Sequence, residues 1–344
     1  MLKGNSITLQ ETNQSLKSFL IIQTASLGDV ILATPIIEKL HHFFPESRID
    51  FLVKDGYQPL LRNHPYISNV LAWDKSEGKY RQLKELINFV RKQHYDTVIN
   101  VQRFASTGLI TVLSGAGQKI GFNKNPFFFL FTRKVKHIID RQGNTHEVDR
   151  NLKLIEHLTD DKRFPVKLYP SKKDDAKMSQ FKTKAYITVS PGSLWFTKKY
   201  PEEKWVEFIS AVDSDLQVYF LGSGDEKELC ERIIKKSGHK LSMNLAGRLS
   251  FLESAVLMRD AQMNYVNDSA PMHLASAVNA PVTAIFCSTV PEFGFGPLSD
   301  RSFVVQTTKK INCRPCGLHG LKNCPEKHFE CAYSIENKQL LEKI

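Results

Sequence analysis

The sequence predicts an α/β protein with two doubly wound domains in series. Short apolar runs, typical of buried parallel strands, alternate with amphipathic helical patterns along most of the 344 residues. This alternation lapses once, where charged residues dominate the middle of the chain, and then restarts. A charged, aperiodic stretch between two such halves is typical of an interdomain linker. We therefore expect two parallel sheets whose carboxyl edges face each other across a cleft.

The first half supplies the predicted domain 18–165, preceded by a polar extension, residues 1–17, that shows no secretory signal. An apolar run at Phe19–Thr24 leads into a turn and a helical pattern that Pro45 stops. Further strand patterns lie at 49–53, 69–73 and 97–101, and helical patterns at 79–94 and 146–158. Strand, turn and helix therefore alternate throughout this domain.

The second half supplies the predicted domain 185–330, after a linker at 166–184. The same alternation returns in it, because strand patterns are separated by helical ones. The strand patterns are 185–190, 216–221, 263–266 and 282–286, and the helical patterns are 201–212, 225–236, 251–260 and 269–278.

Composition and charge indicate what kind of protein this is and what kind of molecule it binds. With 42% hydrophobic and 24% charged residues the chain is typical of a globular protein, and it has no apolar run long enough to cross a bilayer. Its net charge of +11 favours an anionic partner, which can be a phosphorylated ligand, a nucleic acid or an acidic membrane surface. The cytoplasm is the expected compartment.

Loops that follow strands hold the candidate site residues. Ser26-Leu-Gly-Asp29 brings a carboxylate to the cleft, although Asp29 alone is equally consistent with a helix cap. In the second domain, Ser190-Pro-Gly-Ser193 with Thr197-Lys-Lys199 suits a diphosphate, and Gly222-Ser-Gly-Asp225 suits a nucleoside. Asn267–His273 has Ser269 as an N-cap and Asp268 at a strand tip, which favours anion binding at a helix start.

Together these segments resemble glycosyltransferase family nine, the lipopolysaccharide heptosyltransferases. The resemblance runs from about Ser18 to the C-terminus and includes 191–205, 222–228, Asn-Leu-Ala-Gly at 244–247 and 267–275. It implies a GT-B fold, in which two Rossmann-like domains bind the acceptor on the N-terminal side and an ADP-sugar on the C-terminal side. It also implies a final helix, 331–344, that packs back.

The resemblance implies an inverting transfer of heptose from ADP-heptose to a lipid-linked lipopolysaccharide core acceptor, with no metal cofactor and no nucleic acid. Asp29 matches the general base, and Gly28 and Gln102 lie on the acceptor side. The donor-binding positions would be Ser193, Lys198, Gly222, Glu226, Asp268, Ser269 and His273. The alternatives are another nucleotide sugar or acceptor in the same family, or a non-catalytic nucleotide-sugar or nucleic-acid binding protein.

Two segments remain outside this assignment. Cys313, Cys316, Cys324 and Cys331 fit a structural site for zinc or another metal, with His319 and His328 as spare ligand candidates, or else reduced thiols or a facultative disulfide. Residues 118–136 combine five basic residues, no acidic residue and the run Phe127–Phe131. This segment predicts either a buried helix with a basic end or a peripheral contact with the anionic inner membrane.

Overall fold

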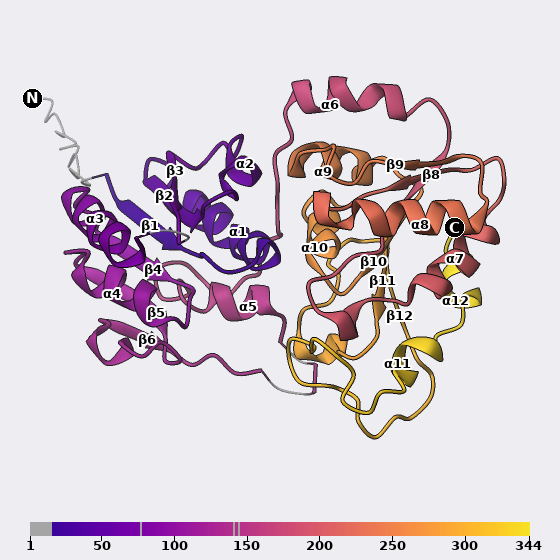
Figure 1. The fold of residues 1–344 in the computed structure, drawn as a ribbon. Coiled ribbons are helices and arrows are strands. Elements are labelled where there is room, and N and C mark those ends of the chain that lie inside the picture. The colour runs from indigo at the N-terminus through magenta and orange to yellow at the C-terminus, as the bar shows by residue number, and fades with distance from the viewer. Residues whose placement is uncertain (1–15, 76–77, 140–141, 144) are drawn as a thin grey trace, which may run out of the picture.

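The computed structural model describes residues 16–75, 78–139, 142–143 and 145–344, so most of the predicted extension 1–17 lies outside it. Figure 1 shows two α/β domains side by side, with the N-terminal sheet in one and the C-terminal helices in the other. Each domain contains one parallel six-stranded sheet, so the predicted α/β class is confirmed.

In the first sheet the strand order is β3-β2-β1-β4-β5-β6. Alternate residues of β1 point to opposite faces of the sheet. Phe19 and Ile21 pack with α1 in one hydrophobic core, and Leu20 and Ile22 belong to a second core. Both faces are therefore covered, as parallel sheets require. The elements are β1 Ser18–Ile22, α1 Leu27–Phe43, β2 Arg48–Lys54, α2 Gln58–Leu61, β3 Asn69–Trp73, α3 Lys79–Lys92, β4 Thr97–Asn100, α4 Ala105–Leu113, β5 Gln118–Phe122, η1 Phe128–Leu130, β6 Arg133–Val135 and α5 Glu147–Leu152.

In the second sheet the strand order is β12-β11-β10-β7-β8-β9. The elements are α6 Lys172–Met178, η2 Ser179–Phe181, β7 Tyr186–Ser190, η3 Phe196–Lys198, α7 Glu202–Ser210, β8 Gln217–Phe220, η4 Gly224–Glu226, α8 Lys227–Ser237, β9 Ser242–Asn244, α9 Phe251–Arg259, β10 Met263–Asn267, α10 Ala270–Ala277, β11 Val282–Phe286, η5 Pro291–Phe293, β12 Ser302–Gln306, α11 Glu330–Tyr333 and α12 Lys338–Leu341.

The strand order places the ligand site of each domain. The order in which successive strands are added to the sheet reverses between β1 and β4 in the first sheet and between β7 and β10 in the second. Ligands bind at the carboxyl ends of strands at such switch points. The loops after these four strands are therefore where the site is expected.

The structure differs from the sequence prediction in two helical segments and in the linker. The segment predicted as a helix at 146–158 is helical only over α5, and its remainder forms turns. The predicted linker contains α6, whose N-cap Ser171 and residue Asp174 form a capping box. The C-terminal segment forms two short helices, α11 and α12, which pack on the second domain through Ile335 and Leu340.

Candidate active site

A cavity of about 750 Å³ lies between the two domains, within the size range of small-molecule sites. Residues from the loops after β1, β7, β8 and β10 line it. The structure thus brings together nearly all the residues predicted for the site: Gly28, Asp29, Ser193, Lys198, Gly222, Glu226, Asp268, Ser269 and His273.

Asp29 both caps α1 and faces the cavity. Its Oδ2 accepts hydrogen bonds from the backbone N–H of Ser26, at 3.1 Å, and from the Ser26 hydroxyl, at 2.6 Å. The backbone N–H of Asp29 donates back to Ser26 Oγ, which completes a capping box. Its Oδ1 makes no hydrogen bond to any described residue. One carboxylate oxygen is therefore fixed, and the other remains for a ligand.

The surroundings of Asp29 make it a stronger base. Burial raises the pKa of this carboxyl above its ordinary value, and the nearby charge of Glu147 adds to the effect. The hydrogen bonds from Ser26 act in the opposite direction. A carboxylate with a raised pKa binds a proton more tightly, which favours abstraction of a proton from a hydroxyl group.

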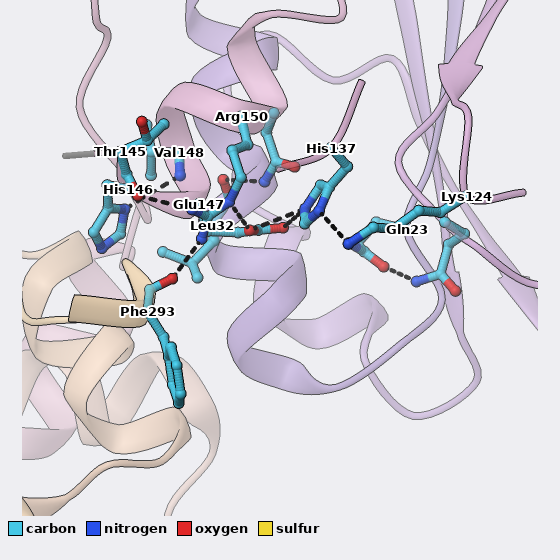
Figure 2. Close-up of polar contacts among 12 residues, drawn as sticks. Gln23, Leu32, Lys124, His137, Thr145, His146, Glu147, Val148, Arg150 and Phe293 are labelled. Atoms are coloured by element: carbon cyan, nitrogen blue, oxygen red, sulfur yellow. Dashed lines mark hydrogen bonds and ion pairs between the residues drawn. The ribbon is translucent and has the colours of Figure 1, made fainter. Parts of the chain in front are cut away.

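Polar contacts made by α5 join the two domains (Figure 2). Arg150 Nε lies 2.6 Å from Glu147 Oε2, and its Nη2 donates to the carbonyl of Phe293 at 2.8 Å. The backbone N–H of Glu147 donates to the Gly294 carbonyl at 2.7 Å. His137 lies between Glu147 and Lys124, as Figure 2 shows. The hydrogen bonds to the carbonyls of Phe293 and Gly294 therefore tie α5 to the second domain, and the intrahelical ion pair orients the Arg150 side chain that makes one of them.

Close packing at Gly28 brings the two helix N-termini together. A Cβ at Gly28 would lie 2.8 Å from Cδ2 of His273, so a larger residue would push α1 away from α10. The carboxylate of Asp29 consequently lies opposite the loop that starts α10.

Lys198 belongs to the cavity, whereas Lys199 does not line it. The Nζ of Lys198 lies 2.7 Å from Asp268 Oδ2, which also accepts a hydrogen bond of 2.6 Å from the Thr289 hydroxyl. Lys199 lines a separate cavity of about 480 Å³. The structure therefore distinguishes two adjacent lysines that the sequence alone does not.

Glycines let the chain close around Glu226. A Cβ on either Gly192 or Gly222 would overlap its side chain. Glu226 Oε2 accepts a hydrogen bond from the backbone N–H of Ser223 at 2.7 Å, which holds the carboxylate at the start of η4. Both glycine-containing loops thus meet at one acidic side chain that lines the cavity.

The start of α10 offers unsatisfied hydrogen-bonding groups. The Ser269 backbone is extended at the N-cap, and its hydroxyl makes no capping hydrogen bond but donates to the Asn267 carbonyl at 3.4 Å. His273 is buried, and its Nδ1 has no hydrogen-bond partner among the described residues. Burial, with the charges of His146 and Lys198, lowers the pKa of His273 to about 3, so the ring is neutral. This nitrogen lies at the cavity wall and is therefore available to a ligand.

Gln102 is the predicted site residue that does not line the cavity. It is buried at the end of β4, where its side-chain amide packs against that of Gln23 and the backbone of Ala25. These contacts join the segment after β4 to the segment after β1.

The cavity lining also includes residues that the sequence prediction did not assign to the donor or acceptor site, among them Tyr57, Thr289 and His319. Tyr57 and Thr289 lie shortly after the predicted strands 49–53 and 282–286, so the rule that ligands bind after strands could have found them. His319 lies in the cysteine-containing segment, which follows no predicted strand.

The four C-terminal cysteines lie in or beside the loop between β12 and α11. Cys313 Sγ lies 3.9 Å from His328 Nε2, and Cys331 is buried. Among the described residues no three His, Cys, Asp or Glu side chains converge closely enough to hold a metal ion. The arrangement does not fit a zinc site as it stands, and the zinc site remains a prediction.

Comparison with known proteins decides the family. The model of glycosyltransferase family 9 (heptosyltransferase) matches residues 83–325, most of the chain. The chain belongs to glycosyltransferase family 9. This enzyme is therefore a glycosyltransferase, and its two facing parallel-sheet domains are those of the GT-B fold.

Relatives of this family 9 enzyme match it over most of their own length. Lipopolysaccharide heptosyltransferase 1 of Campylobacter coli is 24% identical over 94% of this chain and 97% of its own. Lipopolysaccharide heptosyltransferase 3 of Escherichia coli is 27% identical over 76% of this chain and 81% of its own. The solved Escherichia coli ADP-heptose lipopolysaccharide heptosyltransferase II is 20% identical, with a TM-score of 0.76 over 95% of this chain and 97% of that one.

Proposed function

We propose that this enzyme transfers a heptose from ADP-heptose to a lipopolysaccharide inner-core acceptor, with inversion at the anomeric carbon and without a metal ion. The observation that carries the proposal is the placement of Asp29 opposite the loop at the start of α10, within one cavity. The names of the similar proteins support the heptose and the acceptor, and the name of the Escherichia coli structural relative supports the ADP donor.

The transfer is a single displacement. Asp29 takes the proton from the acceptor hydroxyl, whose oxygen attacks the anomeric carbon on the face opposite the diphosphate. As the new C–O bond forms, the bond to the diphosphate breaks and its electron pair leaves with ADP. Inversion follows because the nucleophile and the leaving group occupy opposite faces.

The departing diphosphate gains negative charge that fixed groups can stabilise. Lys198 supplies a full positive charge, and the first backbone N–H groups of α10 supply partial charges at a helix N-terminus. Residues 185–330 would therefore bind the donor, with Glu226 near the nucleoside and Ser193, Ser269 and His273 near the diphosphate and sugar. Residues 18–165 would bind the acceptor.

A donor and acceptor panel tests this function. Purified protein is incubated with ADP- and UDP-sugars and with delipidated or lipid-linked inner-core acceptors, and the products are identified by mass spectrometry. We expect heptose addition from ADP-heptose. Transfer from another nucleotide sugar would select the alternative family function, and nucleotide-sugar binding without any transfer would select the non-catalytic one.

The basic segment 118–136 supports a place at the cytoplasmic face of the inner membrane. It forms β5, η1 and the edge strand β6, which contradicts the buried-helix alternative. Phe131 is buried, but Phe128, Phe129 and Leu130 are exposed, and Arg133, Lys134 and Lys136 are exposed beside them. Exposed apolar residues next to cations suit the surface of an anionic bilayer. Among the described residues, no helix is long and apolar enough to span a membrane.

We expect this surface to bind anionic vesicles in proportion to their charge. Replacing Arg133, Lys134 and Lys136 with Gln should release the protein, because each cation contributes about 1 kcal/mol near an anionic surface. Co-sedimentation with phosphatidylglycerol vesicles at rising salt measures the effect, since the field is screened over about 8–10 Å at physiological ionic strength. The matched control replaces three exposed lysines elsewhere, Lys84, Lys235 and Lys240. No binding at low salt, or equal release of the control, would contradict the membrane contact.

A further inference from the structure

The loop between β12 and α11, residues 307–329, is anchored to the donor side of the cavity. The backbone N–H of Thr197 donates to the Leu321 carbonyl at 3.1 Å, and the backbone N–H of Leu321 donates to Thr197 Oγ1 at 2.8 Å. Arg314 Nη2 donates to the Thr289 carbonyl at 2.7 Å. The loop is therefore held against the segments that carry Lys198 and the Thr289–Asp268 hydrogen bond.

This anchorage places His319 in the wall of the cavity. Leu318 and His319 both line the cavity, and Gly320 passes close to Lys198. A Cβ on Gly320, whose φ is +77°, would lie 2.8 Å from Lys198 Cγ. The ring of His319 is exposed and makes no hydrogen bond to the described part of the chain. An exposed imidazole on a fixed loop in a binding cavity is free to contact a ligand.

Charged groups of both domains shift the pKa of His319. Partial desolvation in the cavity wall and the cations Arg103 and Lys198 lower the pKa of His319, whereas the carboxylates Asp29 and Asp268 act in the opposite direction. The proposed base and the Lys198–Asp268 pair are therefore both close enough to shift the pKa of the ring. In the proposed function, the transferred sugar and its diphosphate would lie among these groups.

We propose that His319 contacts the substrate by donating a hydrogen bond to the donor's diphosphate beside Lys198. The inference rests on the proposed function, because it assumes a nucleoside-diphosphate sugar as donor. The loop belongs to the donor side through Thr197 and Thr289, so His319 is placed to bind donor whether or not acceptor is present. An imidazole N–H is a suitable partner for a phosphate oxygen.

The contact also makes nucleotide binding depend on pH. A bound diphosphate adds negative charge near His319 and raises the pKa of its ring relative to the empty site. The His319 ring then binds a proton more tightly in the complex than in the free enzyme, so the affinity for ADP should rise as pH falls. The charged groups facing the ring, Arg103, Lys198, Asp29 and Asp268, are unchanged in a His319 variant.

Calorimetry with ADP between pH 6 and 8 tests the contact on the full-length protein. His319→Ala should weaken ADP binding about tenfold or more, as for loss of a hydrogen bond to a charged group. It should also reduce the rise in affinity at low pH, and any pH dependence that remains comes from the other titratable groups and from protonation of ADP itself, which acts in the opposite direction. His319→Gln keeps an N–H donor, so it should recover part of the affinity but not the pH dependence.

Lys322→Ala is the matched control, because Lys322 is an exposed cation on the same loop that does not line the cavity. It should bind ADP as the wild type does, and thermal unfolding should show that all variants remain folded. Wild-type affinity in His319→Ala at every pH would overturn this inference alone. Failure of the wild-type protein to bind ADP would overturn the donor assignment and this inference with it.

Discussion

Asp29→Asn should lower turnover roughly 10²–10⁴-fold, the usual contribution of a general base, while leaving ADP affinity unchanged. The substitution keeps the size of the side chain, and an amide oxygen still accepts the hydrogen bond from the Ser26 N–H, so α1 remains capped. The lost function is proton removal from the acceptor hydroxyl. Steady-state transfer assays and ADP calorimetry on the same preparation separate the chemical step from binding.

The pH profile gives a second signature of the same residue. Because burial raises the pKa of Asp29, wild-type kcat/KM should fall as pH is lowered through a pKa above the ordinary aspartate value. Asp29→Asn should lose this acidic limb. Glu46→Gln, at an exposed carboxylate of the same domain, is the control and should behave as wild type. Wild-type turnover in Asp29→Asn would remove this residue from the mechanism.

Lys198→Ala should weaken ADP binding by about 1.5–3 kcal/mol, as for a charge-assisted hydrogen bond. The effect should lie toward the upper end of this range because Lys198 pairs with Asp268 at 2.7 Å. Without the lysine, the buried carboxylate of Asp268 keeps the Thr289 hydrogen bond but has no cation beside it. A diphosphate would then meet an uncompensated negative charge.

Lys199→Ala is the control for this prediction, since Lys199 lines the other cavity and carries the same charge one residue away. Calorimetry with ADP should show loss of affinity in Lys198→Ala only. Equal losses in both variants would indicate a general effect of positive charge, and loss only in Lys199→Ala would mean that the other lysine binds the diphosphate.

Much of the fold follows from the sequence because buried parallel strands are continuous apolar runs. The strands that the pattern missed are β5, β6, β9 and β12, which are short or mix polar and apolar residues at or near the sheet edges. The site residues were accessible by the same reasoning, since parallel strands bring their following loops to one edge of the sheet. This explains why Asp29 and Asp268, more than 200 residues apart, could be assigned to one cavity.

Other features depend on tertiary contacts that leave no local pattern. His319 reaches the cavity because Thr197 and Thr289 hold its loop, and neither contact is visible in the spacing of residues 307–329. From the sequence, the run Phe127–Phe131 was equally consistent with a buried and with an exposed position. In the structure the run divides, because Phe131 packs against Gly121 whereas Phe129 faces outward.

The anomeric configuration of the product tests the central claim, a single displacement assisted by Asp29, most directly. Transfer from ADP-heptose to a delipidated core acceptor is carried out in EDTA, and the new linkage is examined by NMR. The proposed mechanism predicts a configuration opposite to that of the donor, formed at full rate with the chelator present. A product that retains the donor's configuration would contradict it.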